Sequence, residues 1–288
     1  MIWNYLKVGW RTLRRNLLHT TISVVGLAVA TATCLLIGMY VQDELSHDIF
    51  HPDADRIAAL AVENALVEGR GADLSAPYAL RDVVATEVPG LQHVTRTRKA
   101  FATVRRPGQE DPASNRREVL VVDSSFFDVL SGFRVRGEAS ARALDAPNEI
   151  LITPSVAETV FGNREPLGNA LTVDIAGPSR PRGEARSRQY TVAGVVEVPS
   201  NSTVTFDLLV PEASTPPADD PWGAFQYRIY GRAGDEVDMD RLGDTVEAAV
   251  SSSAGDDLVG DVRAIPLPEL YFSNAYSPPR EGFKGRPQ

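Results

Sequence analysis

The chain has 288 residues, a net charge of −9 and a single cysteine. This acidic balance argues against a nucleic-acid partner, because nucleic-acid binding needs a basic surface to meet the phosphates. One cysteine cannot form a disulfide framework, so the stability of any exported domain must come from burial.

An uncharged run of 27 residues extends from Asn16 to Gln42. A helix rises about 1.5 Å per residue, so about 20 residues cross a hydrocarbon core of about 30 Å. We therefore expect residues 17–42 to form a transmembrane helix. A cleaved signal peptide is the alternative, but its apolar region is normally only about 7–15 residues long. A lipoprotein is disfavoured because no convincing lipobox precedes Cys34.

The charges on the two sides of this run are asymmetric. The charged residues before the run are all basic, whereas Asp43, Glu44 and further acidic residues follow it. Lys and Arg stay on the cytoplasmic side, so the N-terminus is expected inside and the chain after Asp43 outside. Residues beyond the first 15 carry a net charge of −13, which suits a soluble extracytoplasmic surface.

Residues 1–16 alternate apolar and basic side chains at helical spacing. This pattern predicts an amphipathic helix in the cytoplasmic interface, with two Trp anchors and basic groups that meet membrane lipid. A plain continuation of the spanning helix is the alternative. The candidate membrane-interface residues are Trp3, Lys7, Trp10, Arg11, Arg14 and Arg15.

Small residues recur at every fourth position of the predicted span. They are Gly26, Ala30, Cys34 and Gly38. Small side chains at this spacing let a second helix approach closely, and packing then replaces the absent hydrophobic drive. We predict that this stripe packs against partner helices.

Beyond the span, strand-like runs alternate with helical segments, which is typical of an α+β fold. Ser75 and Thr153-Pro154 are candidate helix starts. We expect helices over residues 77–88, 124–130, 154–161 and 239–250. We expect strands over residues 57–62, 94–104, 119–122, 150–152, 170–175, 190–196, 203–210, 225–230 and 262–265. Polar stretches at 107–117, 177–188 and 214–220 indicate surface loops.

Chemical motifs are scarce. The sequence has no G-x-x-x-x-G-K-[ST], G-x-S-x-G, H-E-x-x-H or C-x-x-C pattern. The best metal candidate is the group His47, Asp48, His51, Asp53 and Asp55. However, Pro52 interrupts any helix there, and charges at a membrane exit are expected for solvation alone. We therefore predict no catalytic residue, no metal site and no cofactor, and we do not expect an enzyme. Asn201-Ser202-Thr203 is a formal glycosylation sequon that matters only in a eukaryotic secretory route.

Several long segments resemble the MacB/FtsX-type ABC transporter permease family. The stretch YVQDELSHDIFHPDADRI, from Tyr40 to Ile57, resembles the family's YVxDELSYDxFHxxADRIYR-like exit from the first spanning helix. Three later stretches resemble family segments in the same order: VDSSFFDVLSGFRVRGEA, NEILITPSVAETVFGNREPLGNAL and QYTVAGVVEVPSNSTVTFDLLVP. Such long, ordered similarity is more specific than any short motif.

The resemblance implies a fold and a location. The fold class is α+β, with one N-terminal transmembrane helix followed by a mixed α/β periplasmic core domain over residues 43–274. This domain would have two subdomains, a membrane-proximal one (48–120 plus 205–270) and an inserted one (121–204). Composition predicts a disordered tail over 275–288. The location implied is the bacterial inner membrane, with the N-terminus cytoplasmic and the main domain periplasmic.

The resemblance also implies a role without ATP binding by the chain itself. A partner ABC ATPase would drive movement of the spanning helices, and the periplasmic domain would move with them for export or mechanotransmission. Further partners would be additional permease helices or a second permease copy, and a periplasmic adaptor. The candidate coupling residues are Asp43, Glu44, Asp48, Phe50, His51, Asp55 and Arg56.

Family members return to the membrane after this domain, whereas the sequence ends in SNAYSPPREGFKGRPQ, without an apolar run. We therefore expect a truncated product, one piece of a split permease or a relic. Two other classes stay open: a single-pass periplasmic sensor or binding module, and an anchored periplasmic enzyme. About 15 cytoplasmic residues are few for a signalling output, and no catalytic constellation supports the enzyme.

Overall fold

The computed structural model describes residues 2–65, 71–108, 116–137, 144–175, 186–215, 220–254 and 259–273. The chain divides into two compact units, Met1–Ser46 and His47–Gln288. Each is described by itself, and the second is called the head. The predicted tail at 275–288 and most of the predicted loops lie outside the described residues.

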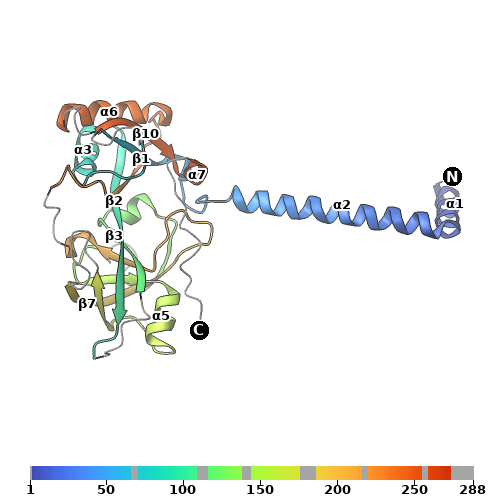
Figure 1. The fold of residues 1–288 in the computed structure, drawn as a ribbon, viewed down its shortest axis with the longest axis horizontal. Helices are drawn as coiled ribbons and strands as arrows, with labels where there is room; N and C mark the ends of the chain where they lie inside the picture. Colours follow the sequence, from blue (N-terminus) through green and yellow to red (C-terminus); the bar gives the residue numbers. More distant parts are fainter. Residues whose placement is uncertain are drawn as a thin grey trace. The chain divides into compact units, whose positions relative to one another are not determined.

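The first unit consists of two helices, α1 (Ile2–Arg15) and α2 (Leu17–Glu44). Asn16 has a non-helical backbone between them, and Figure 1 shows α1 turned away from the axis of α2. Helix α2 buries none of its residues and has a mean hydropathy of 2.2 over its most apolar window. Among the described residues it is the one helix long and apolar enough to cross a membrane.

The head is built on a ten-stranded sheet within the described residues. The strands are β1 (Ile57–Asn64), β2 (Leu91–Arg105), β3 (Arg116–Val122), β4 (Arg134–Arg136), β5 (Glu149–Ile152), β6 (Ala170–Ile175), β7 (Arg186–Glu197), β8 (Leu208–Pro211), β9 (Arg228–Ala233) and β10 (Val259–Pro266). Their order is β10-β1-β9-β2-β3-β8-β5-β7-β4, and β6 pairs with β2 and β7. The pairs β3–β8 and β5–β7 are parallel, and the others are antiparallel.

The helices of the head are α3 (Leu80–Glu87), α4 (Phe126–Val129), α5 (Pro154–Phe161), α6 (Met239–Ala254) and α7 (Leu267–Leu270), with 3-10 turns at Ala54–Arg56 and Glu212–Ser214. Figure 1 shows β2 and β3 running through the middle of the head. Helices α3 and α6 lie with β1 and β10 toward one end, and α5 lies with β7 toward the other. The fold class is therefore α+β, as expected.

Strand β1 shows why the sequence there is a continuous apolar run. Ile57, Ala59 and Ala61 belong to one core cluster, while Ala58 and Leu60 belong to another on the opposite face, under α3 and α6. Successive side chains of a strand point to opposite faces, so a strand covered on both sides is apolar at every position.

For two elements the predicted first residue is wrong, because each begins later in the chain. The helix predicted over 77–88 begins only at Leu80, and Ser75 is not its cap, because Ala76 pairs with Tyr227 as an isolated bridge and Pro77 follows. A residue before proline prefers extended backbone, which delays the helix. The strand predicted over 203–210 begins only at Leu208, because the backbone N–H of Thr203 donates to Asp48 instead of to a neighbouring strand.

Other boundaries differ less. The strand expected over 225–230 is β9, shifted to Arg228–Ala233, and β2 and β7 are longer than expected. Strand β4 and helix α7 were not predicted from the sequence. Thr153 occupies the N-cap of α5 as predicted, but its side chain makes no capping hydrogen bond. The proposed division of the head into two subdomains stays a prediction.

Candidate functional site

The residues expected to couple the span to the head fall on both units. Asp43 and Glu44 lie in the last turn of α2, whereas Asp48, Phe50, His51, Asp55 and Arg56 belong to the head. We call residues 47–57 the junction segment. It is the part of the head that comes first after α2 in the chain.

Asp48 anchors the junction segment in the interior of the head. It is fully buried, and its backbone has a left-handed conformation with φ of 58°. Its N–H donates to the carbonyl of Asn201 over 2.9 Å. Its carboxylate accepts hydrogen bonds from the Thr203 N–H (3.0 Å), the Ser202 hydroxyl (3.3 Å) and the Thr203 hydroxyl. Asp48 is therefore held at four points by three consecutive residues.

The electrostatics of Asp48 reflect two opposed effects. Burial raises the pKa of the Asp48 carboxyl above its ordinary value, because desolvation disfavours the charged form. The hydrogen bonds from Thr203 and Ser202 lower it, since they stabilise the carboxylate. A buried carboxylate tolerates its position only because these donors replace lost water.

His51 makes the second attachment. Its ring is buried, and Nδ1 accepts a hydrogen bond from the N–H of Gly132 over 3.0 Å. Nδ1 is therefore unprotonated and Nε2 carries the proton. Burial lowers the pKa of His51 to about 4, so the ring is neutral at pH 7. Gly132 is required by space here, because a Cβ would lie 2.7 Å from both His51 Nδ1 and the Phe50 carbonyl oxygen.

Aromatic packing extends this attachment into the main core. The Phe133 ring lies 5.1 Å from His51 and 5.6 Å from Phe50, centroid to centroid, both edge-on. Phe133 also contacts Phe206 at 5.5 Å and Phe126 at 5.9 Å. Edge-to-face and offset arrangements at such distances are favourable. The junction segment is thus continuous with a packed aromatic cluster from α4 and the stretch before β8.

Surface ion pairs hold the end of the segment. Asp53 pairs with Arg56 and with Arg232 of β9, both over 3.1 Å, and Arg56 also contacts Asp235. These groups are partly exposed, so each pair contributes little to stability. Asp55 is exposed. The attachment therefore depends on Asp48 and His51 rather than on the charged rim.

The rejected metal candidate has no coordinating geometry. The His47 ring stacks on Tyr271 at 3.7 Å, while Asp48 and His51 are engaged as described. Within the described residues no three His, Cys, Asp or Glu side chains form a group able to hold a metal ion.

The other predicted residues lie on the surfaces of α1 and α2. Gly26, Ala30, Cys34 and Gly38 are exposed, and a Cβ added at Gly26 or Gly38 would have nothing within 4 Å. The interface residues Trp3, Lys7, Trp10, Arg11, Arg14 and Arg15 are also exposed. Arg14 lies over the Trp10 ring at 5.4 Å. Both sets stay predictions.

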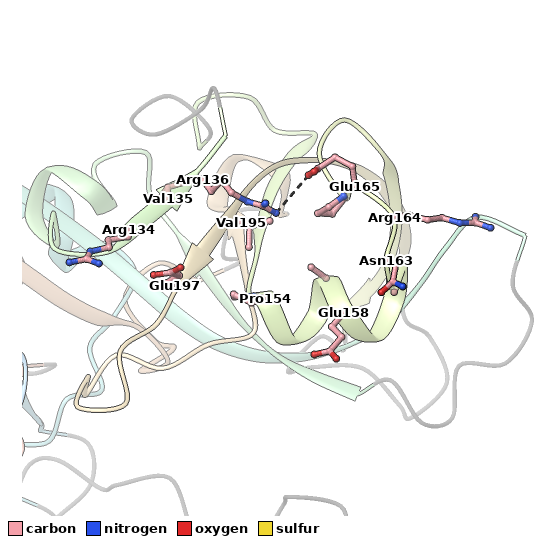
Figure 2. Close-up of a pocket in the computed structure, with 13 residues that line it drawn as sticks. Arg134, Val135, Arg136, Pro154, Glu158, Asn163, Arg164, Glu165, Val195 and Glu197 are labelled. Atoms are coloured by element: carbon pink, nitrogen blue, oxygen red, sulfur yellow. Dashed lines mark ion pairs between the residues drawn. The ribbon is translucent and has the colours of Figure 1, made fainter.

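Two hollows on the head were not predicted. An open groove of about 680 Å³ lies between α5, β4 and β7. Arg136 and Glu165, which line it, form an ion pair over 3.7 Å, and Figure 2 shows the two side chains facing each other. A second, of about 520 Å³, is lined by a charged network in which Asp123 meets Arg96 at 3.1 Å and Arg81 at 3.3 Å. Neither shows a nucleophile activated by a base.

Sequence reasoning missed three partners of the junction segment: Gly132, Ser202 and Thr203. A signal existed for two of them, because the family-like stretch PSNSTVTFDLL contains Ser202 and Thr203. The sequence considered alone suggested only a glycosylation sequon. The structure shows instead that two family-like segments far apart in the chain meet through Asp48.

Comparison with known proteins agrees with this architecture. The family model of the MacB-like periplasmic core domain matches residues 20–249. The chain therefore belongs to this family, and its relatives are ABC transporter permeases of the MacB/FtsX type. No curated protein matches the chain.

Two crystal structures show the same fold. A domain of a protein assigned as a permease, from Porphyromonas gingivalis, is 20% identical with a TM-score of 0.59, over 80% of this chain and 96% of that one. The periplasmic region of MacB from Actinobacillus actinomycetemcomitans is 15% identical with a TM-score of 0.51, over 74% of this chain and 90% of that one.

Proposed function

We propose that this chain is a component of an ABC transporter permease that carries movement from the membrane to a periplasmic head. In this proposal α2 spans the inner membrane with the N-terminus in the cytoplasm. A separate ABC ATPase supplies the energy, and the movement serves export or mechanotransmission. The alternating strands and helices of the head supply a rigid body to be moved rather than a catalytic centre.

The observation that carries the proposal is the attachment of the junction segment. A tether that merely anchors a domain needs no buried contacts at its far end. Here Asp48 is buried and bonded to Ser202 and Thr203, and His51 is buried and bonded to Gly132. Displacing this segment would leave buried polar groups unpaired, which costs about 1–3 kcal/mol for each group. Force applied at residue 47 is therefore passed to the core instead of being lost in a flexible linker.

The partner assignment follows from the family and is tested first. The full chain with an affinity tag is captured from native membranes, and ATP hydrolysis is measured in the purified material. We expect an ATPase and a protein with further membrane helices to co-purify. Capture of the chain alone, without ATP hydrolysis, would contradict the permease assignment.

The coupling role needs a second measurement on the same complex. A fluorescent label on an exposed residue of the head reports nucleotide-dependent movement. Asp48→Ala removes the buried attachment, and Asp55→Ala changes an exposed acidic residue of the same segment as the matched control. We expect the nucleotide-dependent signal to be lost in Asp48→Ala and kept in Asp55→Ala. An equal signal in both variants would show that movement reaches the head by another route.

A further inference from the structure

Two large apolar side chains at one end of the head are more than half exposed within the described part of the chain. Among the described head residues only Ile49, Phe101 and Phe272 are large, apolar and exposed, at 59%, 49% and 54%. Phe101 lies on β2 and is partly covered by the Arg116 guanidinium, 4.4 Å from the ring centroid. No such cation lies over Ile49 or Phe272 among the described contacts. Single exposed apolar residues are common, so their position decides what they mean.

Ile49 and Phe272 are brought to the same end of the head by a ring contact. His47 stacks on Tyr271 with 3.7 Å between the centroids and 12° between the planes. Phe272 lies edge-on to Tyr271 at 5.2 Å. Helix α7, which ends just before Tyr271, lies beside the Ala54–Arg56 turn and the start of β1 (Figure 1). The chain therefore enters the head and reaches the end of its described part at one place.

The short stretch of chain between α2 and this end of the head limits how far the two can be apart. Ile49 follows the last residue of α2 by five positions, and an extended chain spans at most about 3.6 Å per residue, or about 18 Å in all. His47, which holds Tyr271, follows by three positions and lies within about 11 Å. The headgroup region on each side of a bilayer is about 5–8 Å thick. With α2 in the membrane, these apolar side chains cannot lie far from the headgroups.

We propose that Ile49, Tyr271 and Phe272 form a lipid-contact surface that rests on the extracytoplasmic headgroup region of the membrane spanned by α2. Aromatic rings favour this depth because they are apolar in body and tolerate a wet edge. Glu269 is exposed one turn before Phe272, whose N–H donates to the Glu269 carbonyl over 3.1 Å. An acidic neighbour disfavours anionic lipid, so contact is made by shallow apolar insertion rather than by charge. The surface depends on α2 spanning a membrane, but not on the ATPase.

Cysteine-specific labelling tests this surface, because Cys34 is the one cysteine of the chain. Ile49→Cys, Phe272→Cys and the control Phe101→Cys are each made in a Cys34→Ala background of the full chain. Each carries a nitroxide and is placed in phosphatidylethanolamine–phosphatidylglycerol vesicles. Collision with oxygen, which partitions into lipid, is compared with collision with a water-soluble nickel chelate. All three positions are about half exposed, so an unchanged unfolding midpoint is expected.

We expect the oxygen-to-nickel ratio at positions 49 and 272 to exceed that at 101 several-fold, and to be insensitive to the fraction of anionic lipid. A ratio equal to that at 101 would mean that this end faces water, and would overturn the proposal. Low collision with both reagents would mean that protein covers the surface, and would overturn it equally. The native chain labelled at Cys34 reports the span separately. A Cys34 label that collides mainly with the nickel chelate would contradict the assumption that α2 spans the membrane. A Cys34 label in lipid together with a position-272 label in water would contradict only the lipid-contact surface.

Discussion

The carboxylate of Asp48 accepts a hydrogen bond from the backbone N–H of Thr203 over 3.0 Å, although the two residues are 155 positions apart. The hydroxyl of Thr203 donates to the same carboxylate. Asp48 lies just beyond the end of α2 at Glu44, and Thr203 precedes β8 in the middle of the sheet. This contact ties the entry of the head to its interior, and the first prediction addresses it.

Asp48→Asn should lower the free energy of unfolding of the head by about 1–3 kcal/mol. The amide keeps one acceptor oxygen, which can still accept from the Thr203 N–H, but its NH₂ group only donates, so the hydrogen bond from the Thr203 hydroxyl loses its acceptor. Unfolding of the full chain in detergent, followed by the fluorescence of Trp222 in a background with Trp3→Phe and Trp10→Phe, measures the change. Asp55→Asn removes an exposed charge from the same segment and should change stability by less than about 0.5 kcal/mol. Equal effects in the two variants would rule out a special role for the buried carboxylate.

Coupling between Asp48 and Thr203 can be isolated with a double-mutant cycle. Thr203→Val removes the hydroxyl donor and keeps the backbone N–H. We expect the combined Asp48→Asn and Thr203→Val variant to lose less stability than the two single changes added together, by about 0.5–3 kcal/mol. Additive losses would show that the two side chains do not act on each other.

His51 should make the head less stable in acid. Its pKa is lowered to about 4 in the folded state, from an ordinary 6.5. The unfolded chain therefore binds more protons between these values, and stability falls as the pH drops from about 6.5 to about 4. The shift corresponds to about 3 kcal/mol. The raised pKa values of Asp48, Asp123 and Glu212 act in the opposite direction in acid, since their folded forms take up protons more readily.

The contribution of His51 is separated from these carboxylates by a variant that does not titrate. His51→Gln can still accept from Gly132, and it should reduce the loss of stability between pH 6.5 and 4. The measurement is the difference in unfolding free energy between the two pH values, for the parent and the variant. The same pH dependence in both would mean that His51 is not buried in its neutral form.

Gly132→Ala should destabilise the head by about 1–3 kcal/mol, because the new methyl group overlaps His51 and the Phe50 backbone. Gly234→Ala is the matched control, since a Cβ there would meet its neighbours at an ordinary 3.4 Å. Thermal unfolding of the two variants compares them directly. A loss of stability in Gly234→Ala as large as in Gly132→Ala would mean that crowding at His51 is not the cause.

Gly26→Leu combined with Gly38→Leu should weaken co-purification with the rest of the permease. Bulky side chains hold two membrane helices apart where small ones let them approach. Ala28→Leu with Ala32→Leu places the same bulk on the opposite side of α2 and should leave recovery unchanged. The measurement is the amount of partner recovered from native membranes with each double variant. Unchanged recovery with the glycine variant would contradict the predicted packing stripe.

Local sequence signals predicted some elements to the residue. Helix α5 runs from Pro154 to Phe161 as its Thr153-Pro154 start and Phe161-Gly162 end indicate, and β6 covers residues 170–175. In both, a proline, a glycine or a clear alternation marks the boundary within the segment itself. The long apolar helix α2 was predictable for the same reason, because hydrophobic length is a local property.

Elements whose boundaries depend on distant partners were predicted less well. Residues 203–206 have a strand-like sequence, but the Thr203 N–H donates to Asp48 and the Val204 N–H donates to the Ser202 hydroxyl instead of to a neighbouring strand. Strand β4 has three residues and exists because β7 lies beside it. The strand propensity of a segment does not predict which of its backbone groups will hydrogen-bond to a distant carboxylate or to a neighbouring strand.

The sequence by itself determined the long apolar helix, the acidic domain after it and the family, since hydrophobic length, charge and ordered motif similarity are readable along the chain. Only the tertiary structure decided how the junction segment is fixed to the rest of the head. The contacts of Asp48 with Thr203 and of His51 with Gly132 join residues separated by 155 and 81 positions. Such contacts depend on which strands lie together in the sheet, and burial then makes them strong because no water competes for the same donors.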